Sequence, residues 1–526
     1  MADIDGCCAP SSNISPAAHL PTELLLAILD HADRDTTVLA GRVSQRWRAL
    51  ATTHPNYRAH IPLSISYGVT SSRVRAPVSR FRSRIDAATA HGVRMEADVS
   101  ATYGTERWLY SQHGMNTHSV SAVDQTLVRT ICDALPLTVT LHLSLCARIY
   151  DVFQDEARQD PAPLLERLTL LVWSYSFGYT PLALPLDFLC GTAPLLRDVS
   201  LRNVPLTLHV AGALERPSAF RNVRYLFLRL GHQHSLQSIT EHFSNLKSLS
   251  IDLSDGLDVE DDASDPALGD FDAQVAEWGA RLGSILVCLG WRTAPPPSVV
   301  SLLQSAVPVL DVTWISGAAE APDEVPIASY LRHLSGPLEM TVTVGKNDWE
   351  TVLCLHSPST GMTRTFSTPA YLNDVNGSSR FLLGRDIVTQ NFSDERNRDL
   401  LQAVIRFQAS WKLCGEVDWV CVSLPGLERV EIDFRNYTGS MRGLLSQHEY
   451  YFEDIPAEAS DGLGRSVHLL LSAPADEPVT IRATSILRLI YDYRLLRNGT
   501  RPRLMLKNVS LRPSSRDSIL RSVLDD

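Results

Sequence analysis

A short apolar phrase, apolar-x-x-apolar-x-apolar, recurs through the middle of this 526-residue chain and constrains its fold more than any other feature. Four copies in close succession begin at Leu165, Leu196, Val223 and Leu246, the same phrase returns at Leu427, and a looser copy begins at Val309. The last positions of each copy alternate between apolar and polar, which is the pattern of a half-buried strand. A phrase that returns at similar steps predicts units that stack, each burying its apolar face on the next.

We therefore predict an α/β fold in which residues 131–526 form an irregular, leucine-rich-repeat-like solenoid. The spacing of the units is similar to that of leucine-rich repeats, although the Asn that usually follows the repeat strand is absent. Alternation from Val139 to Leu145 predicts one more strand before the first unit. Ordinary strands of an α/β domain are the alternative. The side chains expected to be buried are Leu165, Leu168, Leu170, Leu196, Leu201, Leu226, Leu228, Leu249 and Ile251.

Helices and polar insertions are expected between these strands. Apolar stripes from Phe271 to Leu289 and from Leu400 to Trp411 predict two helices, with Ser393 as a cap for the second. The Ser/Thr-rich segment 359–380 predicts a loop. The acidic segment from Asp255 to Asp265 predicts a solvated insertion that binds no metal tightly, because its like charges repel one another.

Residues 20–50 carry the signals of a helical hairpin. Pro21 suits the start of a helix, and Glu23 places an acid where the helix dipole favours one. Leu20, Leu24 and Ile28 recur every four residues and so share one stripe. Caps are predicted for a second and a third helix, at Asp35 and Thr36 and at Ser44. So short a segment buries too little apolar surface to be stable alone, which favours a partner.

This segment resembles the F-box, the N-terminal module of substrate receptors in cullin–RING ubiquitin ligases. The matching residues are Leu20, Pro21, Glu23, Leu24, Ile28, Leu29, Val43, Ser44, Trp47, Arg48 and Leu50. The departures are Ala32, where Leu is usual, and Thr36-Thr37 in place of Asp-Leu. The resemblance implies docking on the acidic Skp adaptor, while the rest of the chain holds a protein target. The residues expected to bind the adaptor are Leu20, Pro21, Glu23, Leu24, Ile28, Val43 and Trp47.

A second interpretation of the hairpin is a module that packs internally, in a protein-interaction scaffold outside any ligase. Composition fits both interpretations, since 44% hydrophobic and 20% charged residues describe a globular protein. The longest apolar run, Leu24 to Leu29, is too short to span a membrane, and the N-terminus lacks the features of a secretory signal. Nine scattered cysteines favour reduced thiols. We therefore expect an intracellular protein, cytoplasmic or nuclear.

Charge is distributed unevenly along a chain whose net charge is −11. Nine Arg and no acid lie between Thr36 and Ile85, whereas ten Asp or Glu and no Lys or Arg lie between Ser248 and Ala280. The basic segment near the N-terminus favours binding of an acidic partner there, such as an acidic adaptor. Nucleic acid is the weaker alternative, because few aromatic residues are interleaved with the arginines.

Residues with catalytic or metal-binding chemistry do not form a recognised motif. Glycine-rich phosphate loops, the nucleophile elbow, His-Glu-x-x-His and Cys-x-x-Cys are all absent. His232, His234 and His242 are the nearest approach to a metal cluster and are interpreted as surface histidines. Asp270-Phe271-Asp272 is interpreted as acids at a helix N-terminus. Cys414 and Cys421, on either side of Trp419, are expected in the core. We predict no enzymatic activity, no cofactor and no metal.

The predicted organisation has four parts: a disordered tail at 1–18, an F-box-like helical module at 19–62, a linker with connecting helices at 63–130, and the repeat-like α/β domain at 131–526.

Overall fold

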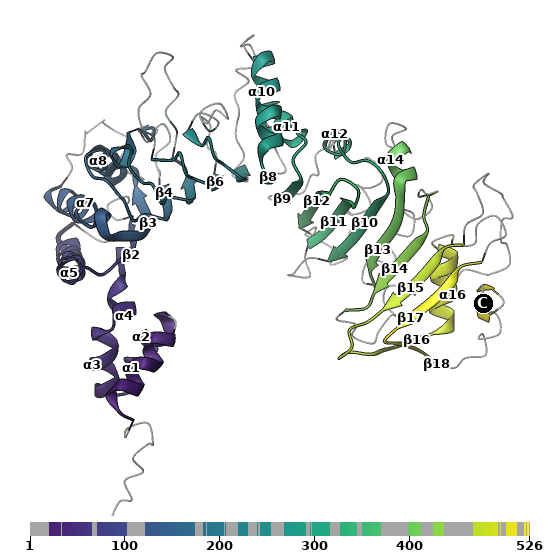
Figure 1. Ribbon diagram of the computed structural model, residues 1–526, viewed down its shortest axis with the longest axis horizontal. Helices are drawn as coiled ribbons and strands as arrows, with labels where there is room; N and C mark the ends of the chain where they lie inside the picture. The colour runs from purple at the N-terminus through teal and green to yellow at the C-terminus, as the bar shows by residue number, and fades with distance from the viewer. Residues whose placement is uncertain are drawn as a thin grey trace, which may run out of the picture. The chain divides into compact units, whose positions relative to one another are not determined.

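The computed structural model forms two compact units, Met1–Val223 and Arg224–Asp526 (Figure 1). It describes residues 20–32, 34–65, 71–102, 121–173, 182–185, 187–204, 206, 219–229, 239, 242–253, 268–290, 295, 297–315, 327–344, 350–369, 398–411, 424, 426–435, 466–492, 495, 501–512, 520–521 and 523–524. The predicted tail, the acidic segment 255–265, His232, His234, Ser393, Cys414, Trp419 and Cys421 lie outside these residues.

The first unit begins with short helices and continues into a parallel sheet. Its helices are α1 (Thr22–His31), α2 (Arg34–Ala40), α3 (Gln45–Thr53), α4 (Pro55–Ala59), α5 (Ser71–Ala90), α7 (Ala122–Ala134), η2 (Leu135–Leu137), α8 (Ala147–Ala157) and η3 (Phe188–Gly191). Its strands are β1 (His60–Ile65), β2 (Met95–Ala101), β3 (Thr138–Cys146), β4 (Arg167–Trp173) and β5 (Asp198–Arg202). These strands are adjacent in chain order, and each pairs in parallel with the next.

The sheet begins earlier than the sequence predicts. Helices α5 and α7 lie in the segment expected to hold a linker and connecting helices, but strand β2 lies there too and pairs with β1 and β3. Met95, Ala97, Val99 and Ala101 are buried in alternation along β2. Two of these four are alanines, whose small side chains make the strand pattern weak in the sequence.

The second unit is also built on a sheet. Its helices are α10 (Leu268–Arg281), α11 (Pro297–Leu303), α12 (Ile327–Tyr330), α14 (Arg398–Ala403) and α16 (Ala483–Asp492). Its strands are β6 (Tyr225–Arg229), β7 (Ser248–Leu253), β8 (Ser284–Gly290), β9 (Val309–Ile315), β10 (Leu338–Val344), β11 (Glu350–Ser357), β12 (Met362–Pro369), β13 (Val404–Ser410), β14 (Arg429–Asp433), β15 (His468–Ser472), β16 (Val479–Arg482), β17 (Arg503–Lys507) and β18 (Val509–Arg512).

In this unit the strand order is β6-β7-β8-β9-β12-β11-β10-β13-β14-β15-β17, and β16 pairs with β18 separately. All pairs are parallel except β10–β11 and β11–β12, which are antiparallel. The segment β10–β12 therefore enters the sheet in reverse order, with β12 against β9 and β10 against β13. We call the strands of the two units, with the helices that cover them, the strand body.

The recurring phrase forms a similar backbone turn before several of the strands. Before strands β4, β5 and β7, the N–H of the first apolar residue, Leu165, Leu196 or Leu246, donates to the carbonyl three residues earlier, at 3.1–3.3 Å. At the start of β5, the N–H groups of Arg197 and Asp198 both donate to the carbonyl of Glu166 in the preceding strand segment. Each turn thus satisfies its backbone groups while it turns the chain into the next strand.

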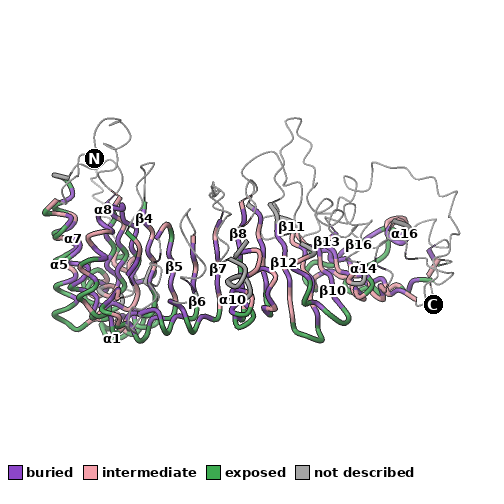
Figure 2. Tube along the Cα trace, turned by 90° about the horizontal axis from the view of Figure 1, so that it is seen from above, coloured by how far each residue is buried: buried purple, intermediate pink, exposed green. Residues whose placement is uncertain are grey.

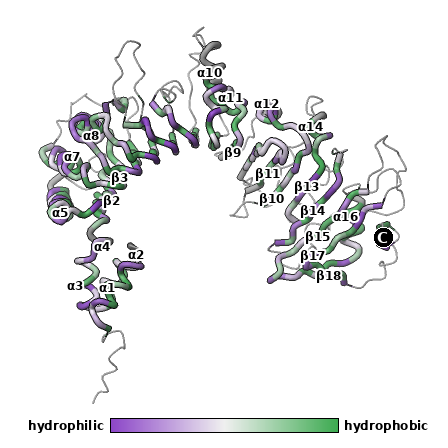
Figure 3. The backbone as a smooth tube through the Cα atoms, in the orientation of Figure 1, coloured by the Kyte–Doolittle hydropathy of each residue, from purple (hydrophilic) through white to green (hydrophobic). Residues whose placement is uncertain are grey.

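The core prediction for these strands is confirmed, since each of the nine side chains expected to be buried is 2% exposed or less. In register, Leu168 pairs with Val199 and Leu226 with Leu249, so apolar residues stack from strand to strand. Buried residues run along the strands and exposed ones gather at their turns (Figure 2). Hydrophilic and hydrophobic residues alternate along strands such as β13–β15 (Figure 3).

The two helices predicted from these apolar stripes are wrong in their second halves, which form strands. Helix α10 ends at Arg281, so Ile285 and Leu289 lie in strand β8. Helix α14 ends at Ala403, and β13 carries Phe407. The predicted Ser/Thr-rich loop is also wrong where the structure describes it, because residues 362–369 form strand β12 of a hairpin with β11.

A buried arginine holds this hairpin against its neighbours. Arg364 on β12 is fully buried and donates to the carbonyls of Val307 at 2.8 Å and Tyr330 at 3.1 Å. Burial lowers the pKa of its guanidinium to about 10. Val307 lies in the segment before β9 and Tyr330 is the last residue of α12, so one side chain fastens three parts of the unit together.

Candidate functional site

The four short helices α1–α4, which we call the helical module, are defined by local signals. Ser44 caps α3, because its Oγ accepts a hydrogen bond from the N–H of Trp47 at 3.2 Å, as predicted. Pro21 immediately precedes α1 and Glu23 lies in its first turn. The predicted cap of the second helix is wrong, since Asp35 and Thr36 lie inside α2. An acid is favoured both at the N-cap and in the first turn of a helix. The sequence alone therefore does not show which of these two positions Asp35 occupies.

Polar contacts fasten the helices of the module to one another. His54, only 4% exposed, pairs through Nε2 with Asp30 Oδ1 at 2.9 Å and so ties the residue after α3 to α1. The guanidinium of Arg46 donates to Thr22 Oγ1 at 3.1 Å. Because both contacts join α1 to the α3 region, they fix the direction in which the side chains of α1 point.

The module has an inner and an outer apolar surface. Leu25 and Leu29 on α1 and Ala51 on α3 are fully buried. A second set of large apolar side chains is exposed, namely Leu24 at 51%, Ile28 at 46%, Leu39 at 56% and Val43 at 68%. We call this set the outer apolar surface. Four large exposed apolar side chains between residues 24 and 43 of so small a module favour interaction with another molecule.

The structure places the predicted binding residues on or near this surface. Leu24, Ile28, Val43, Pro21 and Glu23 are exposed. Leu20 and Trp47 are partly exposed. Leu39 belongs to the same set, but the sequence prediction missed it. No local signal identifies it, because Val43, four residues further on, lies beyond the end of α2 at Ala40.

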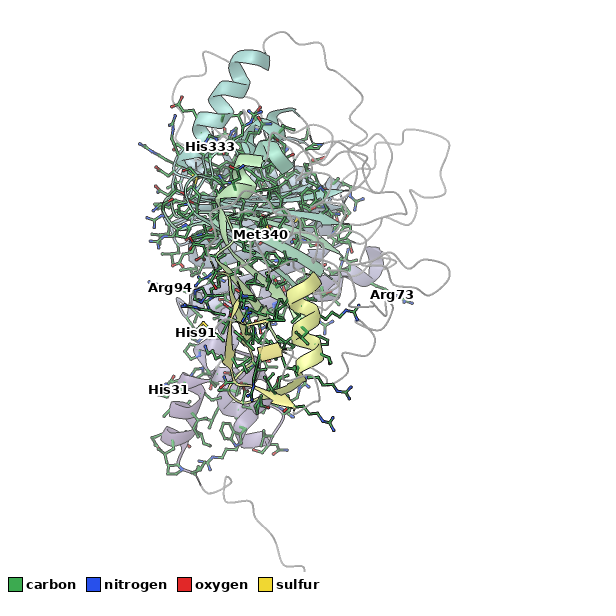
Figure 4. All side chains as sticks on the ribbon, turned by 90° about the vertical axis from the view of Figure 1, so that its right-hand side faces the viewer. His31, Arg73, His91, Arg94, His333 and Met340 are labelled. Atoms are coloured by element: carbon green, nitrogen blue, oxygen red, sulfur yellow. The ribbon has the colours of Figure 1, made fainter. Side chains whose placement is uncertain are left out.

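A basic surface lies beyond the module on helix α5. One side of α5 is buried through Val74, Val78, Phe81, Ile85 and Ala88. Among the described residues, Arg73, Arg75, Arg80 and Arg82 are exposed and have no carboxylate within ion-pair distance. Arg84 is used internally and donates to the carbonyl of His60 at 2.9 Å. Arg73 near the start of α5 and His91 just after its end lie well apart (Figure 4).

Histidine, cysteine and acidic side chains are the candidates for metal binding and catalysis in the described part of the chain. No three His, Cys, Asp or Glu side chains are grouped there as metal ligands would be. Burial raises the pKa of the Cys132 and Cys146 thiols, which disfavours the reactive thiolate. His242 is buried rather than at the surface as predicted. Asp270 and Asp272 lie in the first turns of α10, as interpreted from the sequence.

Comparison with known proteins bears on the helical module. The family model for F-box-like domains matches residues 17–60, which include all four of its helices. Residues 17–60 are an F-box-like domain. The F-box-like domain is a protein-interaction module, so its outer apolar surface points to a protein partner. Comparison with curated proteins gave no match for the chain. No helix in the described ranges is both long and apolar enough to cross a membrane.

Proposed function

We propose that this protein is a substrate receptor of a cullin–RING, SCF-type ubiquitin ligase. The F-box-like domain docks on the Skp adaptor, and the strand body holds a protein target. The observation that carries the proposal is the outer apolar surface, because it lies on the domain that the family comparison identifies.

The chemistry of this surface suits an adaptor. Full burial of an exposed Leu, Ile or Val side chain contributes roughly 1.5–3 kcal/mol, and each of these side chains, already about half buried, contributes about half of that when a partner covers it. Leu24 and Ile28 are one helical turn apart on α1, so a single apolar groove of a partner contacts both. The exposed Arg42 and Arg46 nearby favour an acidic partner by charge complementarity.

The strand body suits target binding, and we propose that it is a degenerate, leucine-rich-repeat-like solenoid. Parallel strands in register and the recurring turn before each strand support this assignment. The protein acts without catalytic chemistry or a cofactor of its own, inside the cell, in the cytoplasm or the nucleus. Its contribution to ubiquitination is to hold two other proteins together.

A scaffold outside any ligase is the alternative function, and it requires that the module pack internally. Leu24 and Ile28 argue against internal packing within the first unit, because about half of each side chain is exposed there. A module that packed on the sheet of its own unit would cover them.

Co-purification with the Skp adaptor tests the proposal. The double substitution Leu24→Asp with Ile28→Asp places two charges on the outer apolar surface and should abolish adaptor binding without unfolding the strand body. Met505→Asp with Leu506→Asp is the matched control, because these side chains are also exposed, at 47% and 39%, but lie on β17. Equal adaptor binding by the two variants would contradict the receptor function.

A further inference from the structure

Within the described residues, β17 is the last strand of its sheet, and one of its edges is open. Its other edge pairs in parallel with β15 (Figure 1). The N–H of Arg503 donates to the carbonyl of Val467, on the side of β15, at 2.9 Å. Backbone groups alternate in direction along a strand, so those of Leu504 and Leu506 point away from β15. In the described part of the chain these outward groups have no backbone partner.

Apolar side chains are exposed along the same edge. Met505 is 47% exposed and Leu506 39%, on opposite faces of the strand. In register, Leu506 pairs with Leu471 of β15, which is fully buried, and the core of the sheet therefore reaches the edge and ends there uncovered. One more strand beside β17 would take up the outward backbone groups and cover Leu506 from the side. An unpaired edge is a template for such a strand.

The charge around the edge is positive. Lys507 on β17, Arg501 before it and Arg512 on β18 are exposed, and no carboxylate of the described residues lies within ion-pair distance of them. The sequence from Tyr493 to Arg516 contains seven Lys or Arg and no Asp or Glu. Acidic side chains on an added strand are therefore favoured, because opposite charges on neighbouring strands attract each other.

A second copy of this chain suits the edge poorly for the same reason. Two β17 strands that paired with each other, in either direction, would bring two basic segments side by side. Like charges on neighbouring strands are destabilising. The charge of the edge thus disfavours self-association and favours an acidic segment of another protein.

Strand β1, which begins the described order of strands, has a different character. Its side chains Ile61, Leu63 and Ile65 are buried, and Arg84 donates to the carbonyl of His60. An edge that is exposed, apolar and basic is therefore found at β17 and not at β1.

We propose that the open edge of β17 docks an extended, acidic segment of a protein target as an additional strand. The segment pairs with the outward backbone groups of Leu504 and Leu506. Its apolar side chains cover Leu506 on the core side, and its carboxylates lie beside Lys507 on the other face. As a target-binding site, the edge rests on the receptor function proposed above. Main-chain hydrogen bonds supply the affinity, and alternate side chains supply the specificity.

Immobilised synthetic peptides probed with the full-length chain test this proposal. The probe is a peptide in which Val and Glu alternate, flanked by Gly and Ser. One comparison peptide has Lys in place of Glu. Another keeps Val and Glu but carries methyl groups on their backbone nitrogens, so that it cannot donate main-chain hydrogen bonds. The chain should be retained by the probe and about tenfold less by either comparison peptide. Equal retention by all three peptides, or by none, overturns the proposal.

A proline substitution tests docking as a strand. Leu506→Pro removes an outward N–H but no hydrogen bond to β15, and proline is tolerated on edge strands. Leu506→Ala is the matched control, because it shortens the same side chain and keeps the N–H. The proline variant should be retained by the Val/Glu peptide several-fold less than the alanine variant. Equal retention of the two variants overturns the proposal.

A charge reversal tests the acidic specificity. Arg501→Glu with Lys507→Glu should lower retention by the Val/Glu peptide about tenfold and raise retention by the Val/Lys peptide. The control Arg129→Glu with Arg332→Glu changes the net charge equally at exposed positions elsewhere and should leave both unchanged. Equal shifts in the two variants would mean that net charge alone governs retention, which overturns the proposal.

Two further measurements separate the possible outcomes. Sedimentation should show a monomer, and self-association that Leu506→Pro abolishes would make a second copy the occupant and overturn the proposal. Adaptor co-purification is measured in parallel. Loss of adaptor binding in the unsubstituted chain refutes the receptor function alone, and specific peptide retention then still supports the docking edge. Adaptor binding without peptide retention refutes the docking edge alone.

Discussion

Leu24 and Ile28 in the helical module are 51% and 46% exposed, whereas Leu168 and Leu170 in the strand body are each 1% exposed. All four are large aliphatic residues in regularly spaced patterns. The strand body is large enough to bury its pattern against neighbouring strands and helices. The module has only four short helices and keeps part of its pattern outside. The same kind of apolar periodicity thus builds a core in one region and a contact surface in the other.

The largest expected effect comes from the core of the strand body. Phe188 is fully buried, with its ring centroid 5.9 Å from that of Phe153 and 6.1 Å from that of Phe220. Phe188→Ala should lower the free energy of unfolding of the first unit by roughly 3–5 kcal/mol, because it leaves a cavity between two rings. Urea denaturation measures this. Tyr225→Ala, at an exposed position, is the control and should change stability by about 0.5 kcal/mol or less. Equal destabilisation by Phe188→Ala and Tyr225→Ala would contradict the contrast between buried and exposed apolar residues.

Neighbouring leucines on α1 give the next effect. Leu25→Ala should destabilise the module by roughly 2–5 kcal/mol, because Leu25 is fully buried. Leu24→Ala should change stability by about 0.5 kcal/mol or less and weaken adaptor binding instead. Hydrogen exchange of the α1 amides reports the first change, and titration with the adaptor reports the second. If Leu24→Ala proves the more destabilising, the assignment of inner and outer surfaces is wrong.

A smaller effect is expected at the cap of α3. Ser44→Ala removes the acceptor of the Trp47 N–H and should cost about 1 kcal/mol. Faster hydrogen exchange at the start of α3 would show it. Ser64→Ala, an exposed position on β1, serves as the control and should leave exchange in the module unchanged.

The smallest effect concerns the arginines of α5. Arg80→Gln with Arg82→Gln should alter stability by about 0.5 kcal/mol or less, since both side chains are exposed. If α5 adds to the attraction of an acidic adaptor, the variant should associate more slowly and with a weaker dependence on salt. Association rates measured at several salt concentrations decide this. An unchanged salt dependence would confine adaptor recognition to the helical module.

Sequence periodicity predicted the strands that bear the recurring phrase, but it could not separate helix from strand where one follows the other. Leu282 and Ile285 continue the spacing of α10, yet Ile285 lies in β8 with Leu289. Residues four apart share a face in a helix and also in a strand, so this spacing does not discriminate between them. Val404 and Phe407 are both buried in β13, because the pairing with β10 shifts register between them. That bulge imitates a helical spacing of three.

The pairing partners of β10–β12 were beyond prediction for a different reason. Nothing local distinguishes a strand that joins the sheet next in order from one that joins it in reverse. At the candidate site, the F-box pattern located the helical module, whereas exposure of Leu39 depends on how α2 packs against α3 and α4. Which residues share a row across the sheet depends on alignment between strands far apart in sequence, such as Tyr225 with Ser248 and Leu286 with Asp311.

The reversed order of β10–β12 also constrains how the second unit is made on the ribosome. Strands β6 to β9 can join the sheet in the order of their synthesis, but the neighbour of β9 is β12. The edge of β9 must therefore wait until the chain has emerged as far as the end of β12 at Pro369, which takes several seconds at ~5–20 residues per second. An unpaired edge is open to wrong pairing during that delay. Early formation of the β11–β12 hairpin, whose turn lies between Ser357 and Met362, shortens the period of risk.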